Sequence, residues 1–183
     1  MLYSIFKIII DTIAGLLAAV LLLRFWMQVV RVRPPAPLAN FTFQLSDWLV
    51  LPLRKVIPGV GGYDWASLLA TFLISLVAHT LEQLWRGDIF SAFNVLPIVL
   101  SILLAALIGM VIWMVYGFMG LLILGAVFSW INPSAPFAPF VNALNDPILR
   151  PLRRVVPLIG NIDLSPLVAL ILLQIALFIL IGR

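Results

Sequence analysis

The sequence predicts an all-α membrane protein with about four transmembrane helices in two tandem repeats, each repeat with a basic amphipathic interfacial helix between its two spans. Composition is one reason: 64% of the 183 residues are hydrophobic and 10% are charged, against about 45–50% apolar and about 25% charged in soluble proteins. The mean hydropathy is +1.21. An internal repeat is the other reason, because residues 45–64 resemble residues 144–163 without a gap.

The repeat is too specific to reflect apolar composition alone. It keeps charged residues, prolines and a glycine at a constant offset of 99 residues, namely Asp47/Asp146, Pro52/Pro151, Arg54/Arg153, Pro58/Pro157, Gly61/Gly160 and Asp64/Asp163. Identity at a fixed offset indicates a duplicated structural unit. We therefore assign residues 1–88 to the first repeat and residues 89–183 to the second, with one copy of the motif between the apolar segments of each.

The composition also limits the chemistry of the protein. The chain has no cysteine and one histidine, so disulfides, thiolate metal sites and cysteine nucleophiles are excluded, and a metal centre is not expected. The sequence lacks a nucleophile paired with a base, a carboxylate pair at helical spacing and a phosphate-binding glycine loop. We expect no enzymatic activity, no catalytic residue and no cofactor.

Residues 8–30 form the first predicted span, because an apolar run of this length crosses a hydrocarbon core of about 30 Å. The run exceeds the apolar region of a signal peptide, about 7–15 residues, so we expect it to stay in the mature protein. Arg24 lies inside the run. We favour a guanidinium that snorkels to the lipid headgroups, with a partner inside the fold as the alternative.

The repeated motif predicts a short basic amphipathic helix, most clearly in its second copy. Apolar residues recur there on one helical face; they are Val141, Leu144, Ile148, Leu152 and Val155. A helix too short and too basic to span is expected to lie along the membrane interface. We predict contacts with anionic headgroups or with a partner for five basic residues: Arg54, Lys55, Arg150, Arg153 and Arg154.

Four aspartates of the motif stand where helices are expected to begin. Asp47 and Asp146 lie early in the amphipathic segments, and Pro147 after Asp146 suits a first helical turn. Asp64 and Asp163 directly precede the next apolar run, where a carboxylate accepts backbone N–H groups and faces the positive end of the helix dipole. We interpret all four as helix caps, with metal or proton chemistry at Asp64 and Asp163 as the alternative.

Six ionisable residues lie in or beside the first two spans, residues 8–30 and 65–85. They are candidates for an intramembrane polar cluster: Lys7, Asp11, Arg24, His79, Glu82 and Arg86. Five of them, all except Arg24, are expected at the level opposite the basic loops. The simpler interpretation, which we favour for these five, is that they are interfacial residues near a membrane surface.

Residues 96–131 are apolar almost throughout and about 54 Å long if fully helical, which is too long for one perpendicular span. Either a single tilted or bent helix with an interfacial start or a hairpin of two helices fits this length. A hairpin would place the two motif loops on opposite faces, and the excess of Lys and Arg in both loops argues against that. We expect one span here, a last span at residues 164–181, both motif loops in the cytoplasm and both termini outside.

The chain resembles the YggT family of bacterial inner-membrane proteins, which has relatives in plastids. The resemblance rests on Pro151-Leu-Arg-Arg-Val-Val-Pro157 and Asp163-Leu-Ser-Pro166, preceded by Phe128-Ser-Trp-Ile131. It covers nearly the whole chain and implies a multi-pass protein of the cell inner membrane without established enzymatic activity. Family members are linked to osmotic or ion tolerance, to division-related genes and, in plastids, to cytochrome assembly and nucleoid distribution.

Two functions fit these features. One is a structural, assembly or stress-tolerance protein whose two basic helices engage anionic lipid, at about 1 kcal/mol per basic residue, and a protein partner or a second copy. The other is an oligomeric ion channel or transporter component linked to osmotic or ion homeostasis, because duplicated membrane units often enclose a path; the mostly apolar midplane argues against it. Specific binding of nucleic acid is not expected, because the arginines lie beside apolar positions suited to lipid.

Overall fold

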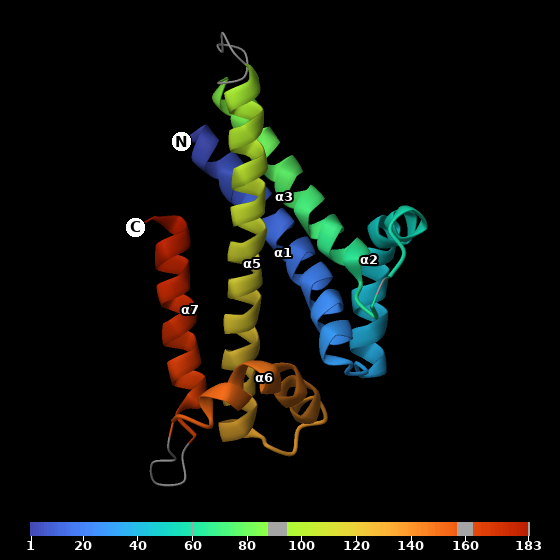
Figure 1. Cartoon of the computed structure of the whole chain (residues 1–183), viewed down its shortest axis with the longest axis vertical. Helices are drawn as coiled ribbons and strands as arrows, with labels where there is room; N and C mark the ends of the chain where they lie inside the picture. Colours follow the sequence, from blue (N-terminus) through green and yellow to red (C-terminus); the bar gives the residue numbers. More distant parts are fainter. Residues whose placement is uncertain (60, 88–94, 157–162, 183) are drawn as a thin grey trace.

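The computed structural model describes residues 1–59, 61–87, 95–156 and 163–182 as an all-helical chain (Figure 1). The predicted all-α class is confirmed, since these residues contain no strand. They form six helices: α1 (Leu2–Val30), α2 (Ala36–Val56), α3 (Trp65–Arg86), α5 (Val95–Ile131), α6 (Ala138–Leu152) and α7 (Ser165–Ile181).

Three of the described helices, α1, α3 and α5, are long and apolar enough to cross a membrane. This is the helix content of a membrane protein. The helix α7 is also apolar but has 17 residues, the lower end of the length that spans a bilayer. A fourth span at α7, and therefore four spans in two repeats, stays a prediction.

The helices α1, α3, α5 and α7 alternate in direction, as Figure 1 shows. α1 packs against α3, α3 against α5, and α5 against α7. In each half of the chain a shorter helix packs against the two longer ones: α2 contacts α1 and α3, and α6 contacts α5 and α7. In Figure 1 α6 lies near the end of α5 that is far from the N-terminus, and α2 lies beside the C-terminal half of α1 and the start of α3. We call the part of the molecule that holds the two copies of the motif, residues 45–64 and 144–163, the motif end. Which side of the membrane it faces stays a prediction.

The long apolar stretch is one continuous helix, so the hairpin alternative is wrong. α5 has 37 residues, which corresponds to about 55 Å at the rise of an α-helix. It extends past both ends of α7 in Figure 1. A helix of this length exceeds a hydrocarbon core of about 30 Å even at a tilt of about 40°, so we expect part of α5 to extend beyond the apolar layer.

Small side chains allow α3 to pack closely between α1 and α5. The buried residues of α3 are Ala66, Ser67, Ala70, Thr71, Ser75, Ala78 and Glu82. Gly109 of α5 lies against this face, since a Cβ there would be 2.7 Å from Nε2 of His79 and 2.8 Å from Oγ of Ser75. Membrane helices commonly associate through small residues, because lipid supplies no hydrophobic force between them.

Two of the four predicted helix caps are wrong, because α2 and α6 begin earlier than the motif. Asp47 lies inside α2, which begins at Ala36, and Asp146 lies inside α6, which begins at Ala138. Each helix has a proline in its first turn, where no intrahelical N–H donor is needed. These upstream prolines, rather than the aspartates, mark the two helix starts.

The apolar side of α6 packs on other helices. Leu144 lies in a buried cluster with Met27 of α1, and Leu149 lies with Leu122 of α5 in another. The indole Nε1 of Trp26 also donates a hydrogen bond to the Leu144 carbonyl at 3.0 Å. α6 is thus fixed to the bundle from both halves of the chain, while its basic residues face outward.

Candidate functional site

A buried carboxylate organises the motif end of the first repeat. Asp64 is the N-cap of α3, and its side chain is 1% exposed. Its Oδ1 accepts a hydrogen bond from the backbone N–H of Ser67 at 3.3 Å, and its Oδ2 accepts one from the Ser67 hydroxyl at 2.8 Å. Asp64 therefore does cap a helix, but the cap satisfies only part of its hydrogen-bonding capacity.

Two arginines from different helices complete the environment of Asp64. From α2, Arg54 donates through Nη2 to Oδ2 at 2.6 Å and through Nε to Oδ1 at 3.2 Å. From α1, Arg24 donates through Nε to Oδ2 at 3.2 Å. Such two-pronged pairing of guanidinium and carboxylate is among the strongest hydrogen-bonded arrangements in proteins. Asp64 consequently joins α1, α2 and α3 at one point.

Arg24 is buried within the fold, so the favoured interpretation that it snorkels to the headgroups is wrong. Its side chain is 6% exposed. Besides Asp64 it contacts Oγ of Ser46 and Oδ1 of Asp47, both at 2.6 Å, and its guanidinium lies 4.9 Å from the ring centre of Phe43. We call these residues the Asp64 cluster: Arg24, Ser46, Asp47, Arg54 and Asp64.

The charges of this cluster keep Asp64 ionised. Burial alone would raise the pKa of the Asp64 carboxyl, but hydrogen bonds from Arg54 and Ser67 and the positive charges of Arg54 and Arg24 lower it below its ordinary value. A buried charge costs free energy unless it is paired and hydrogen-bonded. Arg24 and Asp64 thus depend on each other within the fold.

The second repeat contains the same arginine–aspartate pair in a more exposed setting. Arg153 donates through Nε to Oδ2 of Asp163 at 2.8 Å, and its Nη1 lies 3.5 Å from Oδ1 of Asp146. Asp163 lies one residue before the N-cap of α7, and its Oδ1 accepts the backbone N–H of Ser165 at 2.9 Å. Burial would raise the pKa of Asp163, but the bonds from Arg153 and Ser165 and the charge of Arg153 lower it.

A second charge cluster lies at the opposite end of α1 and α3. Lys7 forms ion pairs with Glu82 and, at 3.1 Å, with Asp11. Nδ1 of His79 lies 3.7 Å from Oε2 of Glu82. Of the six predicted members of an intramembrane cluster, the structure brings together four, which we call the Lys7 cluster: Lys7, Asp11, His79 and Glu82.

The other two predicted members lie elsewhere. Arg24 belongs to the Asp64 cluster at the motif end. Arg86 donates through Nε to the hydroxyl of Tyr3 at 2.8 Å, and its guanidinium lies 5.2 Å from the ring centre of Tyr3. This contact ties the last turn of α3 to the first turn of α1.

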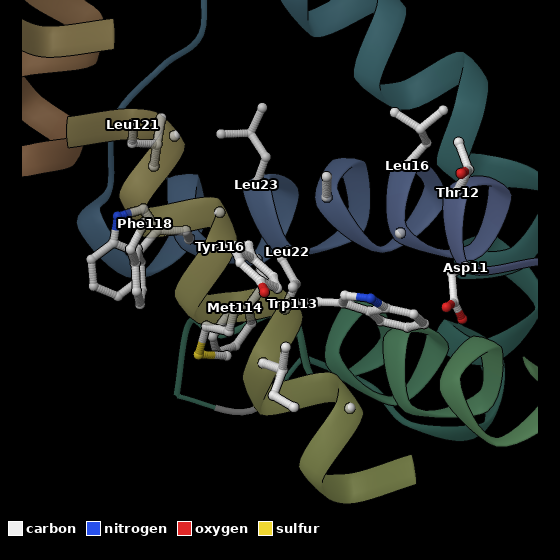
Figure 2. A pocket seen from close by; sticks show the side chains of 18 of the residues that line it. Asp11, Thr12, Leu16, Leu22, Leu23, Trp113, Met114, Tyr116, Phe118 and Leu121 are labelled. Atoms are coloured by element: carbon white, nitrogen blue, oxygen red, sulfur yellow. The ribbon is translucent and has the colours of Figure 1, made fainter. Parts of the chain in front are cut away.

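A largely apolar pocket of about 790 Å³ lies between α1 and α5, with Asp11 and Thr12 at one end (Figure 2). Leu16 and Leu22 line it from α1, and Trp113 lines it from α5. Lys7 and His79 also line it, so the Lys7 cluster borders the pocket. Hydrocarbon is the chemistry that such a lining accommodates best.

The five predicted lipid contacts separate into two kinds. Arg54 and Arg153 hold Asp64 and Asp163, and Arg150 lies 3.9 Å from Asp146. Lys55 and Arg154 are exposed and form no side-chain hydrogen bond or ion pair with the residues the structure describes. The same holds for Arg31 and Arg33, between α1 and α2. Arg31 and Arg33 belong to the excess of Lys and Arg that the sequence offers as a topology signal, and no binding role was predicted for them. Nothing in the sequence indicated that Ser46 is a partner of Arg24.

These features indicate a helical membrane protein with an internal repeat. They are the apolar helices long enough to span a membrane, the duplicated motif, and the arginine–aspartate pair found in each copy of it. The CCB3/YggT family model matches residues 2–85 and 91–183, and the chain belongs to this family. Each matched segment contains one copy of the motif.

Relatives in three bacteria support this assignment. An uncharacterised protein of Pseudomonas aeruginosa is 33% identical over 168 residues, or 91% of this chain and 83% of that protein. The protein called YggT of Escherichia coli K12 is 32% identical over 172 residues, covering 91% of this chain and 84% of its own length. An uncharacterised protein of Haemophilus influenzae is 34% identical over 165 residues, covering 90% and 84%. No solved structure matches the chain.

Proposed function

We propose that this protein is a structural protein of the bacterial inner membrane that uses both copies of its motif to hold anionic lipid at one, cytoplasmic, face. The supporting observation is the distribution of charge. The motif end holds eight basic residues, Arg24, Arg31, Arg33, Arg54, Lys55, Arg150, Arg153 and Arg154, and four acidic residues, Asp47, Asp64, Asp146 and Asp163. The surplus of +4 equals the formal net charge of the whole chain.

The paired arginines and the unpaired basic residues have different roles in this proposal. Arg54 and Arg153 hold the carboxylates that precede α3 and α7, which fixes each short helix to the bundle. Lys55 and Arg154 directly follow these arginines and stay exposed. Each basic residue near an anionic surface contributes about 1 kcal/mol of attraction, so the fixed helices present charge where headgroups lie.

The test measures the lipid shell of the protein. Protein extracted in polymer nanodiscs from vesicles of phosphatidylglycerol and phosphatidylcholine should be enriched in phosphatidylglycerol relative to the starting mixture. A variant with Lys55→Gln, Arg150→Gln and Arg154→Gln should lose most of that enrichment. The control is Lys7→Gln with Arg86→Gln at the opposite end, which should keep it. Equal lipid ratios in the wild type and the starting vesicles would overturn the proposal.

An oligomeric ion channel or transporter component is the second candidate, and one observation favours it. Between Asp64 and Glu82, α3 buries a hydroxyl side chain on successive turns, at Ser67, Thr71 and Ser75. Flux of K⁺ or Na⁺ into liposomes above that of empty controls, abolished by Glu82→Gln, would establish this candidate. The structural proposal predicts flux no greater than the control.

A further inference from the structure

A second pocket lies at the motif end, between the end of α1 and α2. Its volume is about 580 Å³. Arginines line it from three segments of the chain: Arg24 from α1, Arg31 and Arg33 from the connection, and Arg54 from α2. Asp47 is the one acidic residue that lines it. The pocket is therefore concave, basic and at the level where an apolar helix ends.

The charge in this pocket is not neutralised by the protein. Arg24 and Arg54 are balanced by Asp47 and Asp64. Arg31 and Arg33 have no acidic partner among the described residues, so the pocket keeps a surplus of two positive charges. Anionic phosphate groups are bound by such clusters of guanidinium groups, which present several N–H donors to the phosphate oxygens.

The backbone at Arg31 helps to form the pocket. This residue ends α1 in a left-handed conformation with φ of 59°, which a residue other than glycine adopts only at a cost. The turn reverses the chain, and Arg33 follows it into the pocket lining. The two uncompensated arginines thus lie in or directly after a defined turn, and both line the pocket.

Apart from Asp47 and Gln28, the rest of the lining is apolar, which favours an amphiphile over a free anion. Met27, Val32, Phe43 and Leu51 line the pocket beside the arginines. Phe43 and Leu51 remain 39% and 50% exposed. Further large apolar residues of α2 are exposed nearby along the chain, namely Phe41, Leu45 and Trp48. Aromatic residues at this level are typical of the membrane–water interface, and exposed apolar side chains offer contacts for acyl chains.

We infer that this pocket binds the phosphodiester headgroup of one anionic phospholipid, with Arg31 and Arg33 on the phosphate and Phe43 and Leu51 beside the acyl chains. Basic pockets between membrane helices commonly bind anionic headgroups. The inference rests on the proposed function and deepens it, because it assigns one defined site within a generally basic face. Arg24 and Arg54 act as positioning residues, since their guanidinium groups are held by Asp64.

Native mass spectrometry of the detergent-solubilised full chain tests the inference with phosphatidylglycerol and phosphatidylcholine as probes. The wild type should retain one phosphatidylglycerol, and retain it in preference to phosphatidylcholine. The variant Arg31→Asn with Arg33→Gln should weaken this retention about tenfold or more. Asparagine is chosen at Arg31 because it tolerates the left-handed conformation better than most residues. Thermal unfolding should show that the variant remains folded.

The matched control removes the same charge outside the pocket. Lys7→Gln with Arg86→Gln, at the opposite end of α1 and α3, should leave the single retained lipid within about twofold of the wild type. If both double variants weaken retention equally, the pocket inference fails while the general preference for anionic lipid stands. If the wild type shows no preference for phosphatidylglycerol, both the inference and the proposed function fail. Competition by inorganic phosphate as strong as by phosphatidylglycerol would indicate a free-anion site and would also overturn the inference.

Discussion

Asp64 and Asp163 occupy equivalent positions in the two repeats, but the protein surrounds them differently. Each accepts a hydrogen bond from an arginine ten residues earlier, Arg54 or Arg153. Asp64 is 1% exposed and has a second arginine, Arg24, from α1. Asp163 is 31% exposed, and the residue at the offset of Arg24 is Ile123. Both repeats thus contain the arginine–aspartate pair. In the first repeat Arg24 also contacts the aspartate of the pair, and this aspartate is buried.

The second repeat uses a neutral contact where the first uses Arg24. Asn145 stands at the offset of Ser46 and is 2% exposed. Its Nδ2 donates to the carbonyl of Leu121 in α5 at 2.8 Å. In the first repeat, the ion pair between Arg24 and Asp47 therefore joins α1 to α2. In the second repeat, the amide hydrogen bond from Asn145 joins α6 to α5.

Replacing Asp64 or Asp163 by asparagine should show the largest difference in stability between the two repeats. Asp64→Asn should destabilise the protein by about 3–5 kcal/mol, because it breaks the buried Arg24–Asp64 pair and leaves Arg24 with the partly exposed Asp47 as its carboxylate partner. Asp163→Asn should cost about 1 kcal/mol or less, as expected for a solvated ion pair. Thermal unfolding in detergent measures both variants, and similar losses would contradict the difference between the repeats.

A glycine-to-alanine pair tests the neutral contact of the second repeat. A Cβ at Gly125 would lie 2.5 Å from Nδ2 of Asn145, whereas one at Gly120 would meet nothing within 4 Å. Gly125→Ala should therefore displace Asn145 and destabilise the protein by about 1–3 kcal/mol. Gly120→Ala in the same helix should be neutral or slightly stabilising, because alanine favours a helix more than glycine does. Thermal unfolding of both variants is the measurement, and equal effects would refute the close contact.

The pH dependence of stability should reflect both carboxylates. Their pKa values are lowered in the folded protein, so the unfolded chain takes up protons at higher pH than the folded one. Their stabilisation should be complete above the ordinary aspartate pKa of about 4 and decrease as the pH falls through the folded-state values. Below about pH 4, the melting temperature of Asp64→Asn should decline less steeply with falling pH than that of the wild type. Parallel declines would contradict it.

The sequence predicted the fold class and the helices well, because long apolar runs and a duplicated motif are local signals. The pairing of Arg24 with Asp64 was not predictable, because it joins residues 40 positions apart through the packing of α1 against α3. Asp47 was misinterpreted as a cap because the motif begins inside α2, after the helix start at Ala36.

Labelling of single-cysteine variants tests most directly whether both copies of the motif lie at one membrane face. The natural chain has no cysteine, so Lys55→Cys, Arg154→Cys and Ser4→Cys each supply one thiol on an exposed residue. In sealed membrane vesicles, an impermeant maleimide should react with Lys55→Cys and Arg154→Cys from the same side, and with Ser4→Cys from the opposite side. Labelling of Lys55→Cys and Arg154→Cys from opposite sides would contradict a shared lipid-binding face.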